Sequence, residues 1–249
     1  MKGIDLSRED QSRFVVHLTR DDSGTYSSGG QSAYKNFLSI LKSKKIGAYS
    51  SHCLFTPKLK ELGDNSLRKR FYVSCFTETP IGQLAKLIGD KPGRRICLES
   101  YGFVFRKDAF IRSGGSPAIY VNGYSDDCGQ KKSWMRLYSQ WAEDPEANQP
   151  LGRILPLVNV MNDTHDFSWE REWRMIGSFE FTYPEIVAFI LPKDGVVQEL
   201  LDKLEKSGIP TISPGMSYEA IVDEFSKQKR RVRLLYKQLL EAPNKTDSP

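Results

Sequence analysis

Residues 167–175 read Phe-Ser-Trp-Glu-Arg-Glu-Trp-Arg-Met, and the interpretation of this run decides the expected fold. In a β-strand, successive side chains alternate between two faces. The two sets are Glu170, Glu172 and Arg174 on one face, and Trp169, Arg171 and Trp173 on the other. A helix over the same run would be charged on all sides, with no apolar stripe to bury. We therefore predict a strand, anchored in the core by its two tryptophans, that presents two carboxylates and one guanidinium together.

The composition is that of a globular protein. The chain has 249 residues, of which 39% are hydrophobic and 27% charged, which is enough to bury a substantial core. It contains no run of about 18 apolar residues, so we expect no transmembrane helix and no membrane partner. The N-terminal stretch MKGIDLSREDQSRF lacks the apolar centre of a signal peptide. We expect a cytoplasmic location.

The cysteines and the net charge bear on whether the protein has a metal site, disulfide bonds or a nucleic-acid partner. The four cysteines are far apart and form no Cys-x-x-Cys pair; they are Cys53, Cys75, Cys97 and Cys128. We therefore expect free thiols and no metal site. The net charge of +5 permits a nucleic-acid partner but does not require one.

The order of predicted elements indicates an α+β fold with a mixed or antiparallel sheet. The expected strands cover residues 13–19, 70–76, 97–105, 118–121, 167–175, 179–183, 186–191 and 210–213. The expected helices cover residues 33–44, 80–88, 107–113, 131–145, 196–207 and 218–240. Ser32 or a neighbour is expected to cap the first helix.

Three groups of residues are candidates for chemistry. The first is His17, which ends the first predicted strand; the second is the segment with Ser74, Phe76 and Thr77; the third is the pair of glutamates at 170 and 172. Each has an ordinary structural interpretation when taken alone. A histidine in this position can simply satisfy a hydrogen bond, and a Glu-Arg-Glu run can be a solvated strand edge.

Four segments, in order, carry a family resemblance. They are VVHLT (15–19) with NFLSILKSKKIG (36–47), VSCFTETPIGQL (73–84), YGFVFRKDAFIRSGGSPAIYV (101–121) and WEREWRM (169–175). Together they resemble the abortive-infection proteins of the AbiGi type and, more distantly, the toxin-like ADP-ribosyltransferases of phage defence and toxin–antitoxin systems. The resemblance covers residues 13–192, about three quarters of the chain.

This resemblance implies a split mixed β-sheet of the ADP-ribosyltransferase type with flanking helices, in residues 1–213, and NAD as the substrate lying across the two half-sheets. His17 with Thr19 would hold the nicotinamide ribose, and Ser74, Phe76 or Thr77 would frame the nicotinamide. The Ser-Thr-Ser triplet of such enzymes is replaced here by Ser-Cys-Phe-Thr. Which aromatic side chain is used stays open, and the candidates are Phe76, Tyr101 and Phe103.

The expected chemistry suits these residue types. Cleavage of the nicotinamide–ribose bond passes through an oxocarbenium-like cation, which a carboxylate at Glu172 would stabilise. Glu170 would act as general base toward the acceptor, with its pKa raised by Glu172. Arg20 would bind the pyrophosphate, because a guanidinium fork matches phosphate oxygens. The loop at 23–30 would fold over the cofactor as a lid.

Two other functions stay open. The first is a non-catalytic antitoxin or sensor of a two-gene abortive-infection system, which binds a partner protein. The second is a nuclease that uses His17 and the carboxylates. As an ADP-ribosyltransferase in antiviral defence, the chain would modify a nucleic-acid or protein acceptor. We expect residues 214–249 to form a separate basic helix and a flexible tail, whose KQKRRVR run (227–233) is either a solvated face or a phosphate-binding strip.

Overall fold

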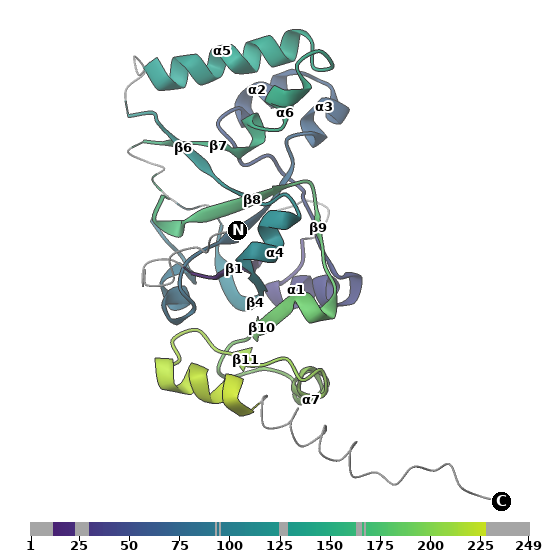
Figure 1. The fold of residues 1–249 in the computed structure, drawn as a ribbon, viewed down its shortest axis with the longest axis vertical. Helices are drawn as coiled ribbons and strands as arrows, with labels where there is room; N and C mark the ends of the chain where they lie inside the picture. The colour runs from purple at the N-terminus through teal and green to yellow at the C-terminus, as the bar shows by residue number, and fades with distance from the viewer. Residues whose placement is uncertain are drawn as a thin grey trace, which may run out of the picture.

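A seven-stranded mixed β-sheet runs through the molecule (Figure 1). The structure is a computed structural model that describes residues 12–22, 30–92, 94, 96–124, 129–162, 166 and 168–227. The strand order is β11-β10-β4-β1-β3-β8-β5, and only the β10–β11 pair is parallel. The strands are β1 (Phe14–Arg20), β3 (Val73–Thr77), β4 (Leu98–Arg106), β5 (Ser116–Pro117), β8 (Glu172–Ile176), β10 (Ile186–Ile190) and β11 (Thr211–Ile212).

Two small sheets and a set of helices complete the α+β fold, which confirms the predicted class. β2 (Lys45–Ile46) pairs with β9 (Phe179–Glu180), and β6 (Ile119–Asn122) pairs with β7 (Val158–Met161). The helices are α1 (Ala33–Ser43), α2 (Thr56–Glu61), α3 (Asn65–Lys69), α4 (Lys107–Arg112), α5 (Gly129–Glu143), α6 (Gln149–Gly152), α7 (Gln198–Lys206) and a last one over 218–227. Short 3-10 helices cover Ile81–Leu87, Leu155–Leu157, Ser168–Glu170 and Tyr183–Glu185. None of the helices in the described part of the chain has the length and apolar character needed to cross a membrane.

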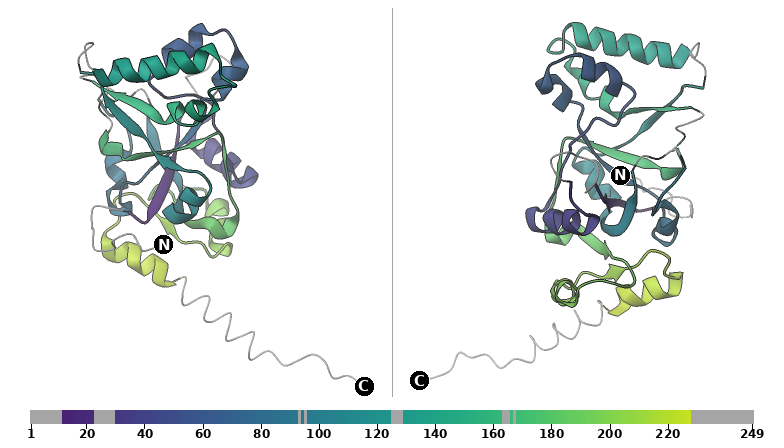
Figure 2. Two further views of the ribbon diagram at one scale, coloured as in Figure 1. Left: turned by 45° about the horizontal axis from the view of Figure 1, so that its top comes forward. Right: turned by 180° about the vertical axis from the view of Figure 1, so that it is seen from behind.

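The sheet packs against different layers on its two faces. On one face an aromatic core joins strand residues such as Phe76 and Phe103 to Phe37 of α1 and Phe110 of α4. On the other face, Val16 and Val104 pack with the 3-10 helix Ile81–Leu87 and with the helix over 218–227. Figure 2 shows α7 and the 218–227 helix at the same end of the molecule.

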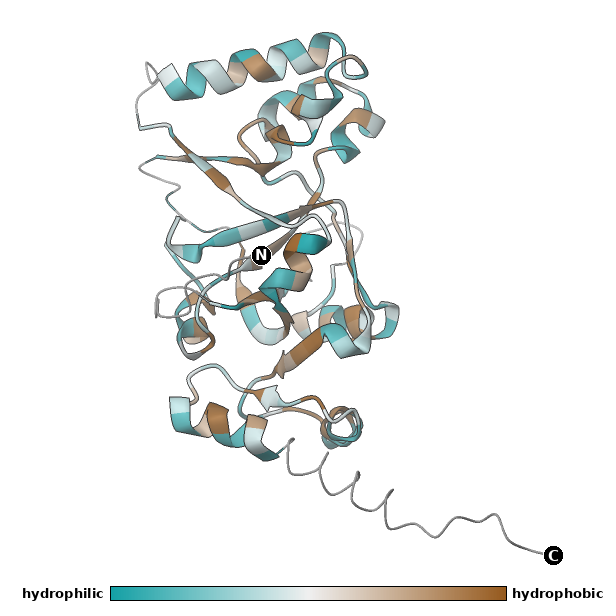
Figure 3. Ribbon diagram, in the orientation of Figure 1, coloured by the Kyte–Doolittle hydropathy of each residue, from teal (hydrophilic) through white to brown (hydrophobic). Residues whose placement is uncertain are grey.

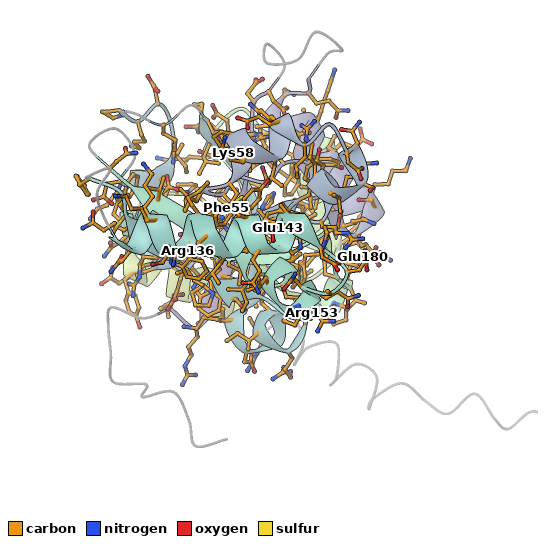
Figure 4. All side chains as sticks on the ribbon, turned by 90° about the horizontal axis from the view of Figure 1, so that it is seen from above. Phe55, Lys58, Arg136, Glu143, Arg153 and Glu180 are labelled. Carbon is orange, nitrogen blue, oxygen red and sulfur yellow. The ribbon has the colours of Figure 1, made fainter. Side chains whose placement is uncertain are left out.

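A third core fills an upper lobe built from α2, α3, α5, α6, β6 and β7. α5 lies across this end of the molecule, as the view from above shows (Figure 4). Phe55 stacks on Tyr138 of α5 at 5.0 Å between ring centroids, and Trp141 meets Phe71 edge-on at 4.7 Å. Colouring by hydropathy shows α5 as mostly hydrophilic with a few apolar residues, whereas β10 is strongly apolar (Figure 3). This contrast is expected of a surface helix and an interior strand.

Local sequence signals account for several boundaries. Ser32 caps α1 as predicted, because its Oγ accepts a hydrogen bond from the backbone N–H of Lys35 at 3.4 Å. α1 ends at Lys44, which takes a left-handed conformation with φ 54°. The helix predicted over 80–88 is instead the 3-10 helix Ile81–Leu87.

The predicted strand over 167–175 is wrong in its first half. Residues Ser168–Glu170 form a 3-10 turn, Arg171 has φ 50°, and β8 begins only at Glu172. Thr77 and Glu78 cause the break: the Thr77 hydroxyl donates to the carbonyl of Glu170 at 2.5 Å, and the Glu78 N–H donates to the carbonyl of Arg171 at 3.0 Å. These bonds hold the turn against the end of β3. Phe167 lies outside the described residues.

The tryptophan anchors also differ from expectation. Trp173 packs against the aromatic core, as predicted, whereas Trp169 is 45% exposed and belongs to the turn. The indole N–H of Trp173 donates to Glu78 at 2.8 Å, and Lys107 donates to the other oxygen of Glu78 at 2.7 Å. Glu78 and Lys107 are both buried. This buried ion pair ties the end of β3, the start of β8 and α4 together.

Replacing Lys107 with Met should destabilise the protein by about 3–5 kcal/mol, because Glu78 keeps a buried charge without its partner. Adding Glu78→Gln should recover part of this loss. The matched control is Lys45→Met, which breaks the exposed pair with Glu180 and should cost at most about 1 kcal/mol. Urea unfolding of the three variants gives the comparison. Equal stabilities of the Lys107 and Lys45 variants would contradict the role assigned to the buried pair.

Candidate functional site

A polar group of side chains lies where β3 and β8 pair. Thr77 is aligned with Glu172, and Cys75 with Arg174, so these four residues share one face of the sheet. Arg94, Tyr120 and Glu170 reach the same group from neighbouring segments. We call this set the Glu172 site; its members are Cys75, Thr77, Arg94, Tyr120, Glu170, Glu172 and Arg174.

Glu172 is held by a two-pronged ion pair with Arg174. Arg174 Nε donates to Oε1 at 3.0 Å and Nη2 donates to Oε2 at 2.9 Å, while the Tyr120 hydroxyl donates to Oε2 at 3.2 Å. Arg174 is 1% exposed, and its Nη1 donates to the carbonyl of Pro156 at 3.0 Å. Burial on its own would raise the pKa of Glu172, but the charge and hydrogen bonds of Arg174 outweigh it and lower the pKa. Glu172 is therefore ionised at neutral pH.

Glu170 has the opposite environment. Burial is the largest influence and raises its pKa, the ion pair with Arg94 opposes this, and the negative charge of Glu172 adds to the rise. Arg94 Nη1 donates to Glu170 Oε1 at 2.9 Å, and Nη2 donates to the carbonyls of Leu87 at 2.6 Å and Gly89 at 2.8 Å. Two neighbouring carboxylates thus have pKa values displaced in opposite directions, which is the arrangement that divides proton transfer from charge stabilisation.

The other members of the site are neutral donors. The pKa of the Cys75 thiol is raised well above its usual value by burial and then by the negative charge of Glu172, so the thiol stays protonated. Burial and the Glu172 carboxylate also raise the pKa of Tyr120, which keeps its hydroxyl as a donor. His52 lies near the site, and its pKa is lowered by burial and by the positive charges of Arg20 and Arg174.

His17 does not join Glu172. Val16 is aligned with Thr77 in β3, and Thr77 with Glu172, so Val16 shares the face of Glu172 and His17 belongs to the opposite face. The His17 ring lies against Phe76 of the aromatic core, with 5.6 Å between centroids. The expected convergence of His17 and Glu172 on one ribose is not present in this register.

His17 instead connects two parts of the sheet. β1 and β4 are aligned from Phe14↔Arg106 to Leu18↔Gly102 and, after a register shift, at Arg20↔Leu98. β1 and β3 are aligned only at Val16↔Thr77. Beside this short contact, His17 Nδ1 lies 2.9 Å from the carbonyl oxygen of Cys75. Because a carbonyl only accepts, Nδ1 carries a proton in this hydrogen bond. Burial lowers the pKa of His17 to about 4.

Three other predicted cofactor residues, Thr19, Ser74 and Phe76, lie away from the Glu172 site. Thr19 is buried, and its hydroxyl lies 2.9 Å from the carbonyl of Ala33 and 3.2 Å from that of Tyr101. Ser74 donates to the carbonyl of Gly177 at 3.1 Å, and Phe76 is 3% exposed within the aromatic core. These three side chains serve internal packing and do not reach the Glu172 site.

Two other predicted cofactor residues, Arg20 and Thr77, are related to the Glu172 site. Thr77 belongs to the Glu172 site. Arg20 follows a register shift in the β1–β4 pairing, so strand alternation from Val16 does not assign it to a face. Arg20 Nε lies 3.5 Å from a carboxylate oxygen of Asp22. The positive charge of Arg20 opposes the rise that burial causes in the pKa of Cys75, and it adds to the lowering that burial causes in the pKa of His52.

Of the aromatic candidates for framing the nicotinamide, Phe103 is fully buried, and Tyr101 packs against Tyr34 and Phe37. The proposed lid, apart from Gly30, lies outside the described residues, as does most of the KQKRRVR run.

Sequence reasoning missed Arg94, Tyr120 and Cys75 as members of the site. Of these, Cys75 had a local signal, because it lies two residues from Thr77 and residues two apart on a strand share a face. Arg94 and Tyr120 reach Glu170 and Glu172 from distant parts of the chain, so no spacing in the sequence indicates that they belong to the site.

In the described part of the chain, no group of three His, Cys, Asp or Glu residues is placed to hold a metal ion. Two surface hollows, beside α7 and beside α6, are lined by none of the Glu172 site.

Comparison with known proteins adds no relative: no protein-family model, no curated protein and no solved structure matches this chain.

The burial of His17 predicts a pH-dependent stability. The folded pKa of about 4 lies below the ordinary 6.5, so the unfolded chain binds more protons between these values. The free energy of unfolding should therefore fall as the pH drops from about 6.5 toward about 4. In His17→Gln, the amide can still donate to Cys75 but does not titrate. Urea unfolding over this range should show a smaller loss for the variant, and equal losses would contradict the assignment; His52 is present in both proteins and cancels.

Proposed function

We propose that this chain is an NAD-dependent ADP-ribosyltransferase whose reaction takes place at the Glu172 site. One observation carries the proposal: Glu170 and Glu172 lie together and have pKa values displaced in opposite directions. A carboxylate that stays ionised and one that accepts a proton are the two groups that a glycosyl transfer of this kind requires.

The reaction breaks the bond between the nicotinamide nitrogen and C1′ of the ribose. The nitrogen keeps the electron pair and leaves as neutral nicotinamide, and the positive charge is left on the ribose as an oxocarbenium ion. Glu172, held ionised by Arg174, stabilises this cation. A hydroxyl or other nucleophile of the acceptor then attacks C1′ and gives its proton to Glu170.

The arrangement of strands is consistent with this proposal. The three predicted stations lie on neighbouring strands β1, β3 and β8. The sheet also divides naturally between β1 and β3, because those strands are aligned at one pair only. This division supports a split sheet of the ADP-ribosyltransferase type. In the revised site, Arg20 and not His17 is the residue of β1 that would meet NAD, through its pyrophosphate.

The biological setting of the proposal comes from the resemblance to abortive-infection proteins of the AbiGi type. We infer a role in antiviral defence, with a nucleic acid or a protein as the acceptor of ADP-ribose. A neighbouring defence protein would then act as the partner that holds the activity in check.

Incubation with labelled NAD and cell extract should label a macromolecule and release nicotinamide. Glu172→Gln should reduce both by on the order of 10²–10³-fold, because the neutral amide does not stabilise the cation. The matched control is Glu180→Gln, which removes a charge from an exposed carboxylate on β9. Absence of labelling and of nicotinamide release in the parent, or a Glu172→Gln variant as active as the control, would refute the proposal.

The role of Glu170 predicts a pH profile. A general base must be deprotonated, so the rate should fall as the pH drops through its raised pKa, above the ordinary 4.5 of a glutamate. Glu170→Gln should lower the rate at neutral pH and abolish this acidic limb. Nicotinamide release measured across pH for both proteins tests this. An unchanged acidic limb in the variant would assign the titration to another group.

A second function is favoured by one feature of the same site. Both oxygens of Glu172 are already bound by Arg174, which is the arrangement of a structural ion pair as well as of a positioned carboxylate. A non-catalytic antitoxin or sensor would keep this pair and bind a partner protein instead of NAD. A tight complex with the product of a neighbouring gene, together with no heat on titration with NAD, would favour this function over the enzyme.

A further inference from the structure

The upper lobe contains a hollow that is separate from the Glu172 site. Its volume is about 220 Å³, and it lies where α5 turns into α6. The residues that line it are Arg70, Trp141, Pro145, Gln149, Gly152 and Arg153. In the view from above, Arg153 lies toward the end of α5 that carries Glu143 and away from Arg136 (Figure 4). The lining brings together two guanidinium groups, one side-chain amide and one indole.

The indole of Trp141 is a buried donor that opens onto this hollow. Trp141 is 1% exposed, and its Nε1 has no hydrogen-bond partner among the described residues. A Cβ built on Gly152 would lie 3.1 Å from Nε1, which is the nearest atom that this Cβ would meet. Nε1 is not among the fully buried atoms that lack a partner, so it reaches the solvent of the hollow and can meet an acceptor there. The absence of a side chain at position 152 leaves room for one.

Two of the residues that line the hollow bind a carboxylate of the chain itself, that of Glu146, which is not one of the lining residues. Arg70 forms an ion pair with Glu146, and the Gln149 amide donates to the other oxygen of Glu146 at 3.2 Å. The side chains of Arg70 and Glu146 are 42% and 66% exposed, so this pair is a surface contact that an external anion can displace. Arg153 has no ion-pair partner in the described part of the chain. Glu146 therefore occupies two of the donors and leaves Arg153 and Trp141 available.

We propose that this hollow is a binding site for a phosphate group, in which Glu146 is the internal competitor of the ligand. Two arginines match the charge of a phosphate dianion, and guanidinium forks suit its oxygens. The volume is below the range of about 300–1,000 Å³ that encloses whole small-molecule ligands. The hollow thus encloses the phosphate of inorganic phosphate or of a phosphate monoester.

The test is a titration of the full chain with inorganic phosphate at constant ionic strength, followed by the indole N–H signals of the four tryptophans in ¹H–¹⁵N spectra. The Trp141 signal is identified through its contacts with the rings of Phe71 and Tyr138. We expect a saturable shift of this signal alone. A tighter titration with ribose 5-phosphate would identify a monoester as the ligand, and equal affinity would identify free phosphate.

Three variants are expected to change phosphate binding in different directions. Glu146→Gln should tighten phosphate binding by roughly fivefold, because it removes the competing charge. Arg153→Gln should weaken it by roughly tenfold or more. Gly152→Ala should abolish the shift, because the added Cβ crowds the indole N–H. The matched control is Glu180→Gln, which removes the same charge elsewhere and should leave binding unchanged.

The proposal is overturned if the Trp141 signal shows no saturable shift in both the parent and Glu146→Gln. It is also overturned if chloride or acetate shifts the signal as strongly as phosphate, because the hollow would then lack the proposed selectivity. Tightening by Glu180→Gln equal to that by Glu146→Gln would show a general charge effect and reject the competitor role.

Discussion

The ion pair between Glu172 and Arg174 is the interaction on which this part of the molecule depends. Two charges have left water here, and only their two-pronged geometry and the extra bonds to Tyr120 and Pro156 compensate the cost of burial. The pair also joins the sheet to the upper lobe, because Pro156 belongs to the segment that leads into β7. Its removal would therefore disturb both the site and the packing of the lobe.

The register between β3 and β8 places the core side chains on one face of the sheet and the polar side chains of the proposed site on the other. Phe76 and Trp173 point into the aromatic core, while Thr77 and Glu172 point to the polar side. The Glu78–Lys107 pair holds this register at its end, just where the chain turns at Arg171. A shift of one residue would exchange the two faces, so these buried bonds protect the site as well as the core.

In both proposed sites, the local main chain controls the position or accessibility of a polar side chain. At the Glu172 site, the carbonyls of Leu87 and Gly89 fix Arg94 beside Glu170. In the upper lobe, the missing side chain of Gly152 exposes the Trp141 indole to the hollow. In each case a turn of the main chain decides whether a charged or polar side chain is available to a ligand.

The sequence by itself determined the α+β class, the cap of α1 at Ser32 and the strand that contains Glu172 and Arg174, because these follow from local periodicity and short-range hydrogen bonds. Only the family resemblance, and no local pattern, places Glu172 at one cofactor with Ser74, Phe76 or Thr77. Only the tertiary structure decided that His17 lies on the other face, since this depends on the register between β1, β3 and β8. The break at Arg171 and the ion pair of Glu170 with Arg94 likewise arise from residues far apart in the chain, whose contacts no local pattern records.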